Sequence, residues 1–85
     1  MTVKQAFKKL ETEGAPICRT MCNAMYNIAF VNSDGKDDET QFDIHGEKTL
    51  KETAEELSSL FADFCKENGL KRNSVYSICY AGPIV

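Results

Sequence analysis

Apolar residues near the start of the chain recur with the period of a helix. They follow the i, i+3, i+4, i+7 spacing of one helical face: Val3, Ala6, Phe7 and Leu10. Lysines fall on the other side of this pattern, and Thr2 can cap its start. Gly14 and Pro16 do not continue a helix. The sequence therefore predicts a helix over residues 2–13.

A longer apolar stripe of the same period begins near the middle of the chain. Its members are Leu50, Ala54, Leu57, Leu60, Phe61, Phe64 and Cys65. Thr49 and Glu52 have the spacing of a capping box, in which each side chain accepts a hydrogen bond from the other residue's backbone N–H. Asn68 and Gly69 are typical of a helix end. The sequence predicts a second helix between these two signals.

Alternation of apolar and polar residues predicts strands over residues 39–45 and 74–81. Residues 17–25 fit both a helix and a strand, because apolar residues recur there at both spacings. The turn sequence at residues 32–35, Asn-Ser-Asp-Gly, favours a hairpin, since Asp and Gly tolerate positive φ angles. We therefore expect a first strand over residues 20–32, with a bulge near Asn23. Whether residues 17–25 are strand or helix stays open.

The predicted order of elements is α-β-β-α-β, which belongs to the α+β class. The second helix is long enough to cross the sheet, and right-handed crossovers favour a third strand beside the first. We expect a three-stranded mixed sheet of order 2-1-3, with both helices on one face. Eighty-five residues suffice for one core, so residues 1–85 are expected to form a single domain.

The composition is typical of a globular protein, with 42% hydrophobic and 27% charged residues. No run approaches the roughly 18 apolar residues that a membrane span needs. The first residues hold no apolar segment of a secretory signal. These features predict an intracellular, cytoplasmic protein without membrane contact.

Four cysteines are candidates for disulfides or for a metal site: Cys18, Cys22, Cys65 and Cys79. Each lies in an apolar periodic segment, where a free thiol packs as a small hydrophobic group. Cys18 and Cys22 have a three-residue gap that differs from the usual zinc spacing, and no second pair completes four ligands. We expect reduced, at least partly buried cysteines, with no metal and no cofactor.

Residues suited to catalysis are sparse. His45 is the only histidine and falls on the polar side of the predicted hairpin. If Gly35 is aligned with the invariant glycine of a calcium loop, Phe30 and Gln41 stand where carboxylates are needed. No phosphate-binding Gly-rich loop and no nucleophile elbow occur. The sequence predicts that the chain is not an enzyme. Direct nucleic-acid binding is also disfavoured, because the domain is acidic and lacks the RNA-reading aromatic pattern.

Charge supplies the first candidate interaction surface. The net charge is −3, but residues 34–67 alone hold eleven acidic residues against four basic ones. The carboxylates fall on the predicted hairpin and on the polar side of the second helix. The predicted contacts are Asp37, Asp38, Glu52, Glu56 and Asp63. Runs of charge usually only keep a protein soluble, yet such a surface can also steer a basic partner.

The second candidate surface is the sheet face that points away from the helices. If the first strand buries Tyr26, Ile28 and Phe30, the residues pointing away are Met21, Met25, Ala29 and Val31, joined by Val75 and Cys79. This predicts an apolar patch, with Met25 and Val31 as contacts, that binds a protein partner or a second copy of the chain. A bent strand and an apolar tail, Ile84 and Val85, would instead cover the patch.

These observations favour a small non-enzymatic regulatory or accessory protein that acts through protein–protein contacts. Apolar contacts on the sheet face are expected to supply more binding energy than the charges. The alternative is an acidic inhibitor of a nucleic-acid enzyme, of the anti-CRISPR or DNA-mimic kind found in phages and mobile elements.

Overall fold

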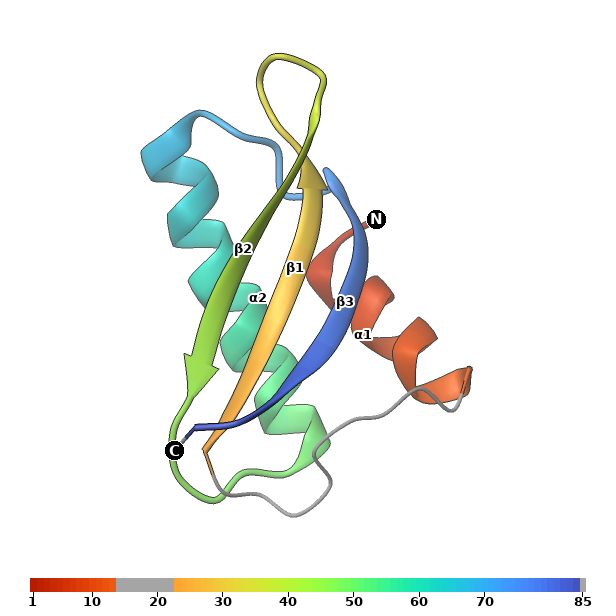
Figure 1. Cartoon of the computed structure of the whole chain (residues 1–85), viewed down its shortest axis with the longest axis vertical. Helices are drawn as coiled ribbons and strands as arrows, with labels where there is room; N and C mark the ends of the chain where they lie inside the picture. The colour runs from red at the N-terminus through yellow and green to blue at the C-terminus, as the bar shows by residue number, and fades with distance from the viewer. Residues whose placement is uncertain (14–22, 85) are drawn as a thin grey trace.

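A computed structural model describes residues 1–13 and 23–84. They form, in chain order, α1 (Val3–Thr12), β1 (Ala24–Val31), β2 (Asp37–Ile44), α2 (Leu50–Asn68) and β3 (Val75–Pro83). The predicted α-β-β-α-β order is confirmed. The three strands form one sheet in the order β2-β1-β3, with β1 in the centre, as the sequence predicts (Figure 1).

The sheet is antiparallel throughout, so the prediction of a mixed sheet is wrong. β1 pairs with β2 and with β3, and both pairs are antiparallel. The reason is the path of the crossover. α2 carries the chain past β1, so β3 runs in the same direction as β2 but lies beside β1. A parallel pair would have required β3 to be the direct neighbour of β2.

The hairpin between β1 and β2 has the tight turn that its sequence predicts. The side-chain Oδ1 of Asn32 accepts hydrogen bonds from the N–H groups of Asp34 and Lys36, at 2.9 and 3.1 Å. Gly35 has a φ of 75°, a left-handed conformation in which a side chain would be strained. This turn sets the register of the two strands, which pair without interruption from Val31–Asp37 to Ala24–Ile44.

The ends of β1 and β2 differ from the predicted ends. β1 begins at Ala24 rather than at residue 20, and β2 begins at Asp37 rather than at residue 39. Of the segment left open between strand and helix, Ala24 and Met25 belong to the strand. Residues 17–22 lie outside the described residues.

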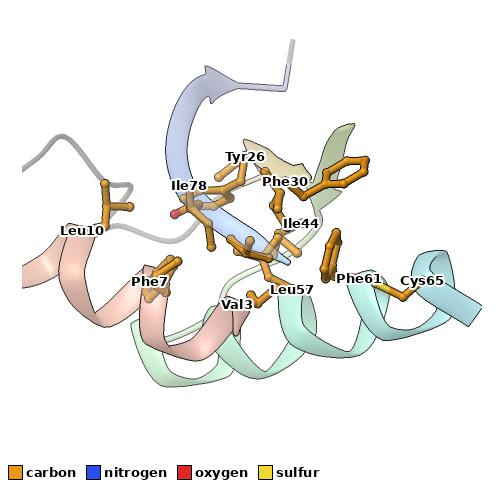
Figure 2. Close-up of a cluster of buried hydrophobic side chains, with 14 residues drawn as sticks. Val3, Phe7, Leu10, Tyr26, Phe30, Ile44, Leu57, Phe61, Cys65 and Ile78 are labelled. Atoms are coloured by element: carbon orange, nitrogen blue, oxygen red, sulfur yellow. The ribbon is translucent and has the colours of Figure 1, made fainter. Parts of the chain in front are cut away.

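One hydrophobic core lies between the sheet and the helices. Alternate residues of β1 are buried in it: Ala24, Tyr26, Ile28 and Phe30. α1 contributes Val3, Ala6, Phe7 and Leu10, and α2 contributes Leu57, Phe61 and Cys65. Figure 2 shows the two helices on the same side of the strands, with labelled side chains such as Phe7, Tyr26 and Leu57 between the layers. Among the described elements, none covers the opposite face of the sheet, which faces the viewer in Figure 1.

The register of β3 breaks where the chain passes Tyr76. Ala29 pairs with Ser77, whereas the next residue of β1, Phe30, pairs with Val75, so Tyr76 is an extra residue on β3. Such a bulge interrupts the alternation of side chains. Val75 is therefore only 2% exposed and belongs to the core. The prediction that Val75 lies on the opposite face is wrong for this reason.

A second break in the same pairing leaves Ala81 as another extra residue, because Met25 pairs with Gly82 and Tyr26 pairs with Tyr80. The bulges thus lie on β3, while Asn23, where a bulge was expected, precedes β1 and has a φ of 39°. β3 is consequently the less regular of the two edge strands.

Candidate protein-binding surface

The sheet face opposite the helices, called here the open face, is more polar than the sequence predicts. β1 presents Met25, Asn27, Ala29 and Val31 on this face. Their pairing partners on β2 are Asp43, Gln41, Glu39 and Asp37, respectively. Val75, expected to extend an apolar patch here, lies in the core, and Met21 lies outside the described residues. The expectation that Val75 extends the patch is therefore wrong, whereas Cys79 pairs with Asn27 and lies on this face as expected.

Met25 and Val31 lie at the two ends of the β1 row. Met25 is half-buried, and its Sδ lies 3.1 Å from Nε2 of Gln41. Val31 is 39% exposed beside the hairpin turn. Between them the row holds a polar residue, Asn27, and a small one, Ala29. The two apolar side chains therefore lie at opposite ends of the β1 row and are separated by Asn27 and Ala29.

β2 is an edge strand, and its carboxylates point to both sides of the sheet. Asp37, Glu39 and Asp43 pair with β1 residues of the open face, so they lie on that face as well. Asp38 lies on the helix side, where it borders a hollow of about 200 Å³ together with Phe64 of α2. All four of these acidic residues are exposed. The edge of β2 therefore carries negative charge along both of its faces.

One flank of α2 lies beside β2. The ring of Phe64 meets the ring of Phe42 on β2, with 6.0 Å between their centroids. The other flank faces α1, because Lys51, Ala54 and Glu55 line a hollow that residues of α1 share. Helical periodicity places four acidic residues on the flank beside β2: Glu52, Glu56, Asp63 and Glu67.

α2 runs behind β2 in Figure 1, and its acidic flank is the one beside that strand, so the two sets of carboxylates belong to neighbouring elements. We call this set the acidic margin: Asp37, Asp38, Glu39, Asp43, Glu52, Glu56, Asp63 and Glu67. It contains every acidic residue that the sequence predicts as a contact. Within residues 1–13 and 23–84, only Glu56 of the margin has an ion pair, with Lys48 at 3.5 Å. Most of the margin's charge is therefore not neutralised by that part of the chain.

Glu52 also has a structural role. Its Oε1 accepts a hydrogen bond from the N–H of Thr49 at 3.0 Å, and its own N–H donates to Oγ1 of Thr49 at 3.1 Å. The predicted capping box is confirmed. The hydrogen bond from the Thr49 backbone lowers the pKa of Glu52 from its usual 4.5. A substitution at Glu52 therefore changes the helix cap as well as the surface.

The other candidate groups are dispersed. No group of three or more His, Cys, Asp or Glu side chains in the described part of the chain is placed to hold a metal ion. His45 is exposed just after β2. Burial raises the pKa of the Cys65 thiol, whereas Cys79 is exposed on β3. The prediction that every cysteine is at least partly buried is wrong for Cys79. Cys18 and Cys22 lie outside the described residues.

Comparison with known proteins finds no relative of this chain. No protein family matches it, and no curated protein or solved structure is significantly similar to it. No helix among the described elements is both long and apolar enough to cross a membrane. Within residues 1–13 and 23–84, the acidic margin is the main concentration of charge without an ion pair.

Proposed function

We propose that this chain is a small binding protein that docks its acidic margin on a basic surface of another protein. The supporting observation is that two neighbouring elements, β2 and the flank of α2 beside it, both carry carboxylates. Asp37 and Asp38 come from β2, while Asp63 and Glu67 come from α2, and none of the four has an ion pair in the described structure. Concentrated charge of one sign speeds association with a partner of opposite charge and selects against other partners.

The open face supplies the apolar part of the same contact. Met25 and Val31 adjoin the margin directly, because they pair with Asp43 and Asp37. Apolar groups near the centre of an interface usually supply most of its binding energy, while charges at the rim set rate and specificity. The β2 positions on this face carry three carboxylates and no basic residue. Stacking two copies face to face would bury that charge, so a different, basic partner is favoured over a homodimer.

A narrower form of the proposal is an acidic inhibitor of a nucleic-acid enzyme. The observation that favours it is the linear arrangement of the carboxylates. Alternate residues of a strand lie about 6.8 Å apart, so Asp37 and Glu39 begin one row along β2, and the carboxylates of α2 form a second row. Two rows of negative charge suit a groove in which Lys and Arg bind phosphates. In this form, added DNA competes with the protein for its partner.

Charge reversal on the margin tests the proposal. The margin variant combines Asp37→Lys, Asp38→Lys and Asp63→Lys, and omits Glu52 because of its role in the helix cap. Proteins captured from an extract of the native host are quantified by mass spectrometry for the wild type and for this variant. We expect the margin variant to lose the partner that the wild type captures.

A matched control variant carries the same net charge but leaves the margin intact. It combines Glu11→Lys, Glu13→Lys and Glu55→Lys, which lie on α1, just after it and on the α1 flank of α2. Five of the six substituted carboxylates are exposed and Glu11 is half-buried. Exposed charges contribute little to folding, so circular dichroism should show both variants folded. Capture of the partner by the control alone supports the proposal. Equal capture by both variants contradicts it.

A further inference from the structure

The free edge of β2 is regular, whereas the free edge of β3 is not. β2 pairs with β1 through eight consecutive residue pairs without a shift of register. β3 has bulges at Tyr76 and Ala81. In addition, the N–H of Val75 on β3 donates to the carbonyl of Met1 at 3.1 Å. Bulges and covering segments are the usual means by which an edge strand avoids pairing with other chains. Of the described strands, only β2 offers a continuous edge.

The hairpin determines which backbone groups of β2 point outward. The N–H of Asn32 donates to the carbonyl of Lys36 at 2.8 Å, which makes these residues a hydrogen-bonded pair. In antiparallel strands such pairs recur at every second position. The intervening Val31 accordingly directs its N–H to the other side, to Ser74 at 3.0 Å. The residues of β2 whose N–H and C=O groups point outward are therefore Asp37, Glu39, Gln41 and Asp43.

The side chain of Asp38 already binds one of these outward N–H groups. Its Oδ1 accepts a hydrogen bond from the N–H of Glu39 at 2.8 Å. No side chain in the described part of the chain accepts a hydrogen bond from the N–H of Gln41 or Asp43. The segment of β2 that remains available for pairing is therefore centred on Gln41.

We propose that the edge of β2 binds an extended segment of the basic partner by strand addition, and that this segment alternates Lys or Arg with apolar residues. The inference rests on the proposed function, to which it adds the mode of binding. Backbone hydrogen bonds to Gln41 and Asp43 hold the added strand, as in other complexes formed at sheet edges. Its side chains on the open face lie near Glu39 and Asp43, and those on the helix side lie near Phe42. The first set of neighbours selects cations, and on the helix side Phe42 selects an apolar group opposite it.

A second copy of the chain is a poor occupant of this edge. If two β2 edges pair antiparallel about Gln41, Glu39 of each copy lies opposite Asp43 of the other. Like charges directly opposite each other destabilise a strand pair. The charges of the edge therefore favour a basic segment over self-association.

Two synthetic octapeptides with capped ends test strand addition. In the first, Lys and Val alternate, and in the second, four Lys precede four Val, so that composition and charge are equal. Binding to the whole protein is measured by isothermal titration calorimetry. We expect the alternating peptide to bind more tightly. Equal affinities would overturn strand addition, and so would failure of the alternating peptide to bind at millimolar concentration.

Two variants at Gln41 separate the backbone from the side chain. Gln41→Pro removes the outward N–H but no hydrogen bond to β1, and edge strands tolerate proline at such positions. Gln41→Ala removes the side chain and keeps the N–H. We expect Gln41→Pro to weaken binding of the alternating peptide by up to about tenfold, as the loss of one backbone hydrogen bond allows, and Gln41→Ala to bind the peptide like the wild type. Equal weakening by both variants would overturn the backbone role.

Amide hydrogen exchange gives a readout that does not depend on a variant's folding. In the wild-type complex with the alternating peptide, we expect the N–H groups of Gln41 and Asp43 to exchange more slowly. Unchanged exchange at both residues would overturn strand addition. The proposed function would still stand if the margin variant fails to capture the partner while its control succeeds, so the two hypotheses fail separately.

Discussion

The rings of Phe42 on β2 and Phe64 on α2 meet edge to face, at an interplanar angle of 86°. Phe64 also meets Phe30 of β1, with 5.5 Å between the ring centroids. These contacts hold the acidic flank of α2 beside the edge of β2. Aromatic packing at the border of the core thus positions both rows of the acidic margin.

Phe61 should be among the most sensitive positions in the core. It is 1% exposed, and its ring meets that of Phe30 at 5.7 Å. Phe61→Ala should lower the free energy of unfolding by about 3–5 kcal/mol, a large share of the stability of so small a domain. Urea denaturation measures the change, with the exposed Ser59→Ala as the control. A loss below about 1 kcal/mol would show that this face of α2 does not pack against the sheet.

The bulge at Tyr76 predicts that two adjacent residues of β3 differ sharply in their effect on stability. Val75 is 2% exposed and Tyr76 is 45% exposed. Val75→Ala should cost about 1.5–3 kcal/mol, from two buried methyl groups and the space they leave. Tyr76→Ser should change stability by about 0.5 kcal/mol or less. If the chemical denaturation of the two variants shows the reverse order, β3 has the uninterrupted alternation that its sequence predicts.

The cap of α2 should make stability depend on pH through Glu52. The hydrogen bond from Thr49 lowers the pKa of Glu52 in the folded chain. Ionised Glu52 therefore stabilises the fold above its unfolded-state pKa, and this contribution is lost as the pH falls through the lower, folded-state value. The difference in unfolding free energy between wild type and Glu52→Gln should be larger at pH 7 than at pH 3. A difference that is independent of pH would contradict this role.

Cys79 and Cys65 should differ in reactivity. Cys79 is exposed, whereas Cys65 is buried and lies 3.7 Å from the carbonyl of Lys71. Burial raises the pKa of the Cys65 thiol, so less of the reactive thiolate forms at neutral pH. Iodoacetamide followed by peptide mass mapping should label Cys79 in the native protein and Cys65 only after denaturation. Equal labelling of both in the native state would contradict the packing of α2.

The elements with a strong periodic signal could be predicted from the sequence. The apolar stripe of α2 and its capping box at Thr49 identify the helix, and the turn at residues 32–35 identifies the hairpin. The bulges of β3 could not be predicted, because Val75, Ile78 and Tyr80 are compatible with more than one register until β1 is placed beside them. The direction of β3 relative to β1 follows from the predicted order 2-1-3, because a crossover that makes β3 parallel to β2 makes it antiparallel to the β1 strand between them.

The acidic contacts could be predicted in part. Glu56 and Asp63 share a flank by helical period, and Asp37 and Asp38 lie on the neighbouring hairpin. The sequence does not show that Asp38 bonds the N–H of Glu39, or that Gln41 lies at the centre of an open edge. Both depend on the hydrogen-bonding register of the strands. The predicted strand order of 2-1-3 already places the second strand at an edge of the sheet. This order is the feature of the sequence that indicated an open edge on that strand.

Substitutions on the open face should change the dissociation rate of the complex, whereas substitutions in the acidic margin should change its association rate. Met25→Glu or Val31→Glu adds charge beside the carboxylates of β2 and removes apolar contact. In the captured complex, we expect these variants mainly to speed dissociation, since loss of desolvated contacts acts on the off-rate. Surface plasmon resonance measures both rates. Unchanged dissociation in both variants would exclude the open face from the contact.

The most direct test of the acidic margin is the association rate of the captured partner as a function of salt. At low ionic strength, we predict that the variant with Asp37→Lys, Asp38→Lys and Asp63→Lys associates at least about tenfold more slowly than the wild type. The wild-type rate should fall toward that of the variant as salt approaches about 1 M, where screening acts within about 3 Å. Rates that are equal for the two proteins, and that do not change with salt, would contradict the acidic margin as the docking surface.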